Sequence, residues 1–200
     1  MNPNSKVFTF DPVEHKYFLD GVEIPGVTTI LKEAGLRPTY NGFTDATLRG
    51  LHTHQACEYL DLNDLDWRSV YPAWAGYVKA WERFKEETGF VPELIEYQTY
   101  HPDFRFGGTM DRRGMLPSLG ERRVELDLKT GVEEDWHALQ TAGYQLLGRD
   151  AWAKDRRGAV YLKEDGSYRL VWHDDPGDLR VVLSGLTICH YKRSHACRTY

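Results

Sequence analysis

RRVELDLKTG, residues 122–131, decides the fold, because apolar and charged side chains alternate along it. Successive side chains of a β-strand point to opposite faces of the sheet. The valine and leucines at the even-numbered positions from 124 to 128 therefore share one face, and Glu125, Asp127 and Lys129 share the other. Such a strand is either solvated at a sheet surface, with an Asp–Lys pair, or brings two carboxylates and an ammonium group to a functional site.

Further strand-length and helix-length segments surround this strand. Apolar alternation and turn residues predict strands at 6–12, 15–26, 92–101, 104–116 and 122–131, and a hairpin at 156–172. Apolar residues three to four apart predict helices at 27–36, 43–62, 71–89, 135–152 and 177–197. The clearest helix has one apolar stripe, which we assign to the core: Trp74, Tyr77, Val78, Trp81 and Phe84.

This order of segments predicts an α+β, or mixed α/β, fold in one domain, 1–200. We expect an N-terminal β-hairpin with helices over 1–90, a core over 91–172 that holds a central mixed β-sheet flanked by helices, and a C-terminal helix over 173–200.

Composition limits the function classes. A net charge of -5 argues against a protein coated in basic charge, although it allows a local basic cleft. No apolar run approaches the roughly 20 residues of a membrane span, and the first residues do not resemble a secretory signal. The scattered cysteines, Cys57, Cys189 and Cys197, suit a reducing cytoplasm and have no metal-finger spacing.

Two neighbouring motifs favour a functional site over a solvated strand. Asp111 ends GGTMD in the preceding strand, and Gln140 and Tyr144 lie four residues apart on the following helix. These three segments are a strand with an aspartate, a strand with Asp-x-Lys and a helix with a polar face. Together they can bring two carboxylates, a lysine, an amide and a phenol to one place.

The ordered motifs GGTMD, ELDLKTG and QTAGY resemble those of the PD-(D/E)XK nuclease superfamily, in its RecB-like and phage exonuclease branch. LRGLHTH, residues 48–54, is similar to that branch's R-G-x-x-x-H segment, and the N-terminal run HKYFLDGVEIPGVTTIL is similar to that of phage members. Met110 stands where the superfamily's name has proline, and Leu51 replaces a usual threonine. Relatives with an iron–sulfur cluster use four cysteines, so we expect no cluster in this chain.

The resemblance implies a restriction-endonuclease-like core and a metal-dependent DNA exonuclease. Asp111, Asp127 and His54 would bind Mg²⁺ or Mn²⁺ with the main-chain carbonyl of Leu128, and Lys129 would orient the attacking water or stabilise the charged phosphate.

Other residues near the motifs have open roles. Gln140 and Tyr144 would contact the substrate phosphate or the water shell, or form a polar helix face. Glu96 would act behind the ligands, at a second metal or in an ordinary salt bridge, and Glu125 would lie near the mouth of the cleft.

DNA would be held by a basic groove through phosphate contacts, which read no sequence. Lys154 and seven arginines beside the motifs are the candidates: Arg49, Arg112, Arg113, Arg122, Arg123, Arg156 and Arg157. Trp and Tyr side chains could stack on the bases of a single strand.

Three functions remain open from the sequence. The first is an exonuclease of phage-type recombination, replication or repair, with a single-strand annealing protein as implied partner. The second is a catalytically silent nucleic-acid-binding module on the same fold, and the third is a CRISPR-adaptation-type nuclease without an iron–sulfur cluster. Polarity, strandedness, DNA or RNA preference, endo- or exonuclease action, one or two metal ions and oligomeric state are not fixed.

Overall fold

The computed structural model describes residues 6–39, 44–120 and 122–196. Cys197 and the rest of the expected C-terminal helix to 200, and Phe43 at the start of an expected helix, lie outside the described residues. The strands are β1 (Phe8–Asp11), β2 (Lys16–Leu19), β3 (Val22–Ile24), β4 (Val91–His101), β5 (Phe106–Leu116), β6 (Arg122–Lys129), β7 (Arg156–Leu162) and β8 (Tyr168–Trp172). The α-helices are α1 (Val27–Glu33), α2 (Asp45–Asp61), α3 (Ala75–Thr88), α4 (Trp136–Leu147) and α5 (Gly177–Ala196).

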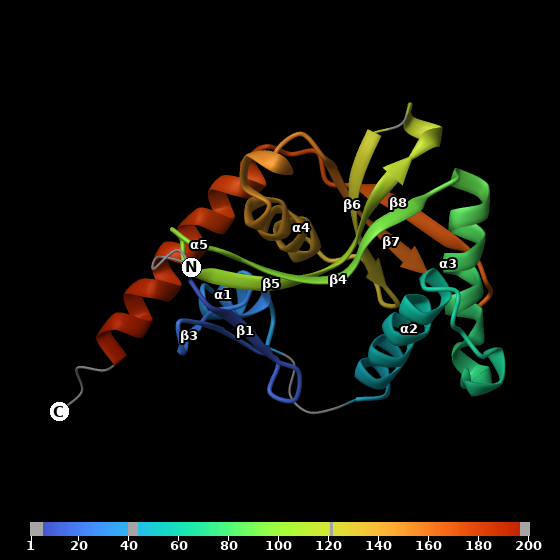
Figure 1. The fold of residues 1–200 in the computed structure, drawn as a ribbon, viewed down its shortest axis with the longest axis horizontal. Coiled ribbons are helices and arrows are strands. Elements are labelled where there is room, and N and C mark those ends of the chain that lie inside the picture. Colours follow the sequence, from blue (N-terminus) through green and yellow to red (C-terminus); the bar gives the residue numbers. More distant parts are fainter. Residues whose placement is uncertain (1–5, 40–43, 121, 197–200) are drawn as a thin grey trace.

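The strands form two sheets (Figure 1). The small sheet is antiparallel, in the order β1-β2-β3, and its β2–β3 turn contains Asp20 and Gly21 in left-handed conformations, as the turn signal predicted. The large sheet has the order β4-β5-β6-β7-β8, with β6 and β7 parallel and the other neighbours antiparallel. The α+β prediction with a central mixed sheet is confirmed.

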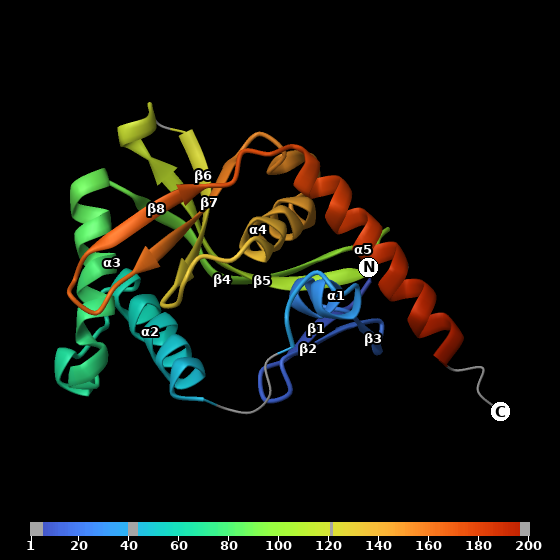
Figure 2. The same ribbon diagram turned by 180° about the vertical axis from the view of Figure 1, so that it is seen from behind.

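Helices cover both faces of the large sheet (Figure 2). One core, between the sheet and α3, contains Trp81, Phe84 and the even-numbered apolar residues of β6. The other core joins α1, α4 and α5 to β5. The expected two-faced β6 is confirmed, but a solvated strand is wrong, because Glu125 and Asp127 are each only 1% exposed.

The predicted stripe of the 71–89 helix is confirmed as core. Tyr77, Val78, Trp81 and Phe84 are buried, and Trp74 packs against the same core from just before α3. Gly89, at φ 72°, ends the helix in the left-handed conformation that glycine adopts readily. Within the described residues, no helix has the length and apolar character needed to cross a bilayer.

The side-chain alternation of β5 is interrupted at Asp111. Met110 packs in the core with α4, yet Arg112, two residues later, lies near Trp81 on the opposite face. Opposite this point, Glu96 of β4 lies between the paired positions Ile95 and Tyr97 with φ 43°, a left-handed value that is uncommon for a residue with a side chain. The irregularity places Glu96 and Asp111 next to each other at the site described below.

Candidate active site

The site forms where β5 and β6 part. Their ladder runs from Leu116–Arg122 to Arg112–Leu126, and the next carboxylate, Asp111 Oδ2, accepts a 2.7 Å hydrogen bond from Leu128 N–H. The side chain of Asp111 therefore lies beside the residue between Asp127 and Lys129.

Helix α2 brings His54 to the same place. Its Nε2 donates to the main-chain oxygen of Leu128 at 2.9 Å, while Nδ1 lies 3.5 Å from Asp111 Oδ2 and 3.6 Å from Glu96 Oε1. One ligand atom from each of His54, Glu96 and Asp111 can be chosen so that all lie within 4.8 Å of one another. The sequence left the role of Glu96 open between a position behind the ligands, a second metal and an ordinary salt bridge. In the structure its carboxylate is a member of the cluster itself.

Charge at this cluster favours a cation. Burial lowers the pKa of His54, but the carboxylates of Asp111, Glu96 and Asp127 outweigh burial and raise it to about 9. For Glu96, burial raises the pKa, whereas His54 and Arg112 lower it more, so its pKa is below the usual value. Without metal, a protonated imidazole ring therefore partly neutralises the carboxylates.

Lys129 connects the strand to helix α4. Its Nζ lies 2.5 Å from Asp127 Oδ2 and donates to Gln140 Oε1 at 2.8 Å, and Gln140 Nε2 donates to Tyr144 OH at 2.7 Å. The amide of Gln140 is thus oriented by two fixed neighbours and in turn holds the ammonium group. Burial and then the charges of Asp127 and Asp111 raise the pKa of Tyr144 well above its usual value, so the phenol keeps its proton.

The donor set fits a hard divalent ion. Both oxygens of Asp127 are buried without a partner of hydrogen-bonding geometry, and burial raises the pKa of this carboxyl despite Lys129. Carboxylate oxygens, one main-chain carbonyl and one imidazole suit Mg²⁺ or Mn²⁺. His54, Glu96 and Asp111 offer the ligand atoms that lie together and could hold the ion. Asp127 is not part of this group, and its role as a ligand, like that of the Leu128 carbonyl, stays a prediction.

The basic groove is not formed as expected. Arg112 is fully buried, and Arg157 is buried with its guanidinium on Ala138 O and Asp178, so the DNA-binding assignment is wrong for both. Such donors have no access to phosphate.

The other arginines are dispersed. Arg122 and Arg123 begin β6, about 13–17 Å from Asp127 at the strand rise per residue. Arg113 pairs with Asp155, Arg123 with Glu93 and Arg156 with Asp174. Arg49 stacks over Tyr77. A role in DNA binding stays a prediction for these five residues.

Glu125 does not lie at a cleft mouth. It is 1% exposed, and neither carboxylate oxygen has a hydrogen-bond partner. Burial, followed by repulsion from Asp127, raises its pKa well above the usual value. Helix α4 covers this face of β6, which the alternation pattern alone could not show.

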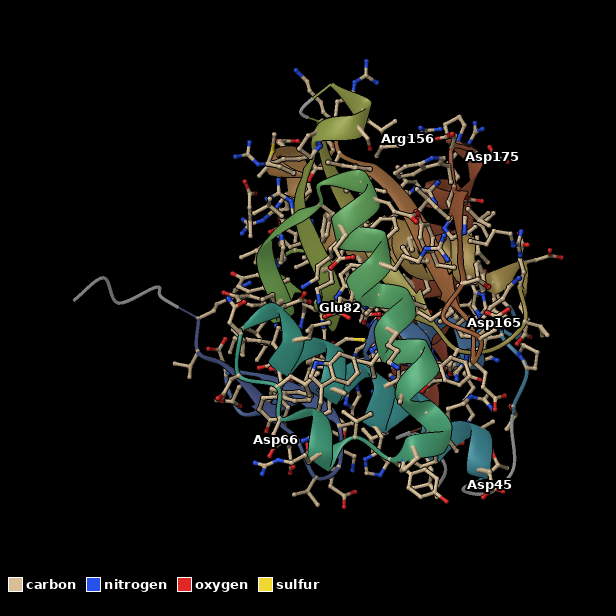
Figure 3. The ribbon with its side chains drawn as sticks, turned by 90° about the vertical axis from the view of Figure 1, so that its right-hand side faces the viewer. Asp45, Asp66, Glu82, Arg156, Asp165 and Asp175 are labelled. Atoms are coloured by element: carbon tan, nitrogen blue, oxygen red, sulfur yellow. The ribbon has the colours of Figure 1, made fainter. Side chains whose placement is uncertain are left out.

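Acidic side chains are spread over the α3 side of the molecule, on which Arg156 also lies (Figure 3). Figure 3 shows Asp66, Glu82 and Asp165 distributed over this side. A cavity of about 600 Å³ lies between α2 and the segment from Leu65 to Val78, lined by His52, Tyr59 and Trp74 among others. It contains no residue of the His54 cluster, so we do not place the chemistry there.

Comparisons with known proteins add little. No family model matches the chain, and no curated protein matches it by sequence. Among solved structures, an alkaline exonuclease from Laribacter hongkongensis, LHK-Exo, is 15% identical with a TM-score of 0.40, over 86% of this chain and 92% of that chain. LHK-Exo in complex with dAMP is 16% identical with a TM-score of 0.34, over 86% and 93%. Similarity this low carries no argument about activity, so we argue the function from the geometry of the site.

Proposed function

We propose that this chain is a divalent-metal-dependent deoxyribonuclease of the PD-(D/E)XK type, acting as an exonuclease in phage-type recombination, replication or repair. The observation that carries the proposal is the convergence at the β5–β6 end. Asp111 bonds to Leu128 N–H, His54 bonds to Leu128 O, and Asp127 and Lys129 flank the same residue.

Phosphodiester hydrolysis needs an activated water, relief of charge on phosphorus and help for the leaving oxygen, and a bound Mg²⁺ or Mn²⁺ supplies Lewis acidity for all three. The chain's own groups do the rest. Asp111 and Asp127 present oxygen donors from two strands, and His54 and Glu96 complete the cluster. Lys129 contacts Asp127 and Gln140, and in this proposal it orients the water or stabilises phosphate charge.

We assign Lys129 to orientation and charge stabilisation rather than to proton abstraction, because its two contacts are acceptors for an ammonium group. Gln140 and Tyr144 act through Lys129 in this arrangement, since the amide oxygen bonds the ammonium group and the phenol bonds the amide.

The test is digestion of 5′- and 3′-labelled duplex and single-stranded DNA with Mg²⁺, Mn²⁺ or EDTA. Asp127→Ala and Lys129→Ala should each abolish cleavage and leave the fold and much of the metal-free DNA binding intact. Asp64→Ala and Lys79→Ala are matched controls, because both residues are exposed and lie outside the site. A fully active Asp127→Ala protein would rule out the site.

The catalytically silent DNA-binding module is the second candidate. It predicts DNA binding without cleavage under every metal condition. The intact Asp111, Asp127 and Lys129 set speaks against it, because a silent relative needs only to lose one of them. The CRISPR-type alternative is disfavoured by the cysteine count of three.

A further inference from the structure

Arg112 is a fully buried arginine that donates to three acceptors through Nε and one Nη, while its other Nη has no hydrogen-bond partner among the described residues. Its Nε donates to Asp61 Oδ2 at 2.5 Å, and one Nη donates to Glu96 Oε1 at 2.9 Å and to the main-chain oxygen of Asp111 at 2.6 Å. One side chain therefore contacts two members of the cation cluster and the last residue of α2.

Asp61 anchors this arginine. Its side chain is 0% exposed and also accepts hydrogen bonds from Trp81 Nε1 at 3.0 Å and from Lys85 Nζ at 2.6 Å. Asp61 follows His54 by seven residues, about two helical turns, so both residues lie on the face of α2 that meets the sheet. The pair Asp61–Arg112 thus fixes the helix that carries His54.

Apolar packing fixes α2 less than it fixes α3, although Cys57 lies in the α3-side core and Leu60 packs against it. The buried residues of this helix are Thr53 and Cys57, whereas α3 buries Tyr77, Trp81 and Phe84 among others. The position of His54 therefore depends also on polar contacts: its own bond to Leu128 O and the Asp61–Arg112 pair seven residues away.

Glu96 also needs an external constraint. Its left-handed φ of 43° persists in a strand only where the surroundings enforce it. The Oε1 atom that Arg112 bonds is the same atom that lies 3.6 Å from His54 Nδ1. The guanidinium therefore orients the carboxylate oxygen that faces the cluster.

We propose that Arg112, anchored by Asp61, is a positioning residue that sets the Glu96 carboxylate and the His54-bearing helix for one divalent cation. The inference rests on the proposed function, because it concerns the same site. A buried ion pair is weak evidence for stability, since apolar residues of similar volume often replace one without loss. An apolar side chain could not hold two carboxylates in a defined geometry, and lysine offers a single point charge instead of a planar fork.

The test is a titration of the full chain with Mn²⁺ in the absence of DNA. Calorimetry or electron paramagnetic resonance measures the bound Mn²⁺ and gives its Kd. Arg112→Met and Arg112→Lys should each raise the Mn²⁺ Kd by about 10–100-fold, the usual effect of removing a group that orients a metal ligand. Cleavage should return at excess Mn²⁺ in both variants, whereas Asp127→Ala should stay inactive. Arg83→Met is the matched control, because Arg83 also pairs with a glutamate, Glu87 at 2.6 Å, away from the cluster.

Circular dichroism and thermal unfolding in EDTA identify variants that fold. A folded Arg112 variant with wild-type Mn²⁺ affinity overturns the inference and leaves the proposed function standing. If neither Arg112 variant folds, the Asp61→Asn variant tests the inference instead. Its amide oxygen can still accept the hydrogen bond from Trp81, but the charge that pairs with Arg112 is lost. A raised Mn²⁺ Kd in Asp61→Asn supports the inference, and an unchanged Kd overturns it. A wild-type chain that binds no Mn²⁺ overturns both proposals.

Discussion

Replacing Glu125 by methionine should stabilise the protein. Glu125 is buried in β6, opposite Arg113 of β5 and Arg157 of β7, but those guanidinium groups bond to Asp155 and Asp178 instead. Both Glu125 oxygens are therefore left without a hydrogen-bond partner.

The size of the effect follows from this isolation. A buried polar group without a partner costs about 1–3 kcal/mol, and methionine fills a similar volume without a polar atom. Glu125→Met should therefore raise the unfolding free energy by about 1–3 kcal/mol, or Tm by roughly 2–12 °C in a chain of this length. Glu125→Gln removes the charge but leaves an unpaired amide, so its gain should be smaller.

The gain should also depend on pH. Burial raises the pKa of Glu125 above its unfolded value, so its contribution to stability is present at acidic pH and is lost as pH rises through the folded pKa. The advantage of Glu125→Met should accordingly grow from acidic to alkaline buffer. Urea unfolding followed by tryptophan fluorescence measures it, with exposed Glu86→Met as control. A destabilised Glu125→Met protein, or a gain that does not change with pH, would refute the reasoning and mean that an arginine pairs with Glu125.

Three further outcomes are expected. Mn²⁺ at about 100 times its Kd should raise the unfolding free energy by about 2.7 kcal/mol, and EDTA should remove this gain; equal unfolding curves would contradict a cation site. Burial, with the charge of Lys129, lowers the pKa of His137 from 6.5 to about 4, so its stabilisation is present above 6.5 and is lost as pH falls toward 4. That loss should be about 3 kcal/mol in urea unfolding of the wild type and absent in His137→Gln. Gly76→Ala should destabilise by about 1–3 kcal/mol, because the added Cβ would lie 1.6 Å from the main-chain oxygen of Glu164, whereas Gly50→Ala, with 3.9 Å to its nearest neighbour, should not.

Local patterns in the sequence were sufficient to predict the helices, the strands and the two different faces of β6. Alternation with period two and helical spacing are properties of short segments, so they predicted the strands and the buried stripe of α3. Motif order also placed Asp111, His54 and Gln140 on the right elements, β5, α2 and α4. The structure places these residues in contact with Leu128 or Lys129, while their chemical roles stay predictions.

Nonlocal packing decided the rest. Arg112 was assigned to a DNA groove because it follows a motif aspartate and carries a phosphate-binding group. Its burial depends on the break in alternation at Asp111 and on the left-handed Glu96, a residue type that gives no local sign of positive φ. Asp61 was missed altogether, although its spacing of seven from His54 placed both on one helical face.

The charges around the cluster balance when His54 is protonated. Lys85 and Arg112 match Asp61 and Glu96, and Lys129 matches Asp127, which leaves Asp111 to face His54. A protonated imidazole compensates this last carboxylate, but a nitrogen atom that binds a metal ion must be unprotonated. A divalent cation at the cluster would supply positive charge in place of the His54 proton, so proton and metal would compete for one place. The raised pKa of His54 is therefore the expected property of a cation site in its metal-free form.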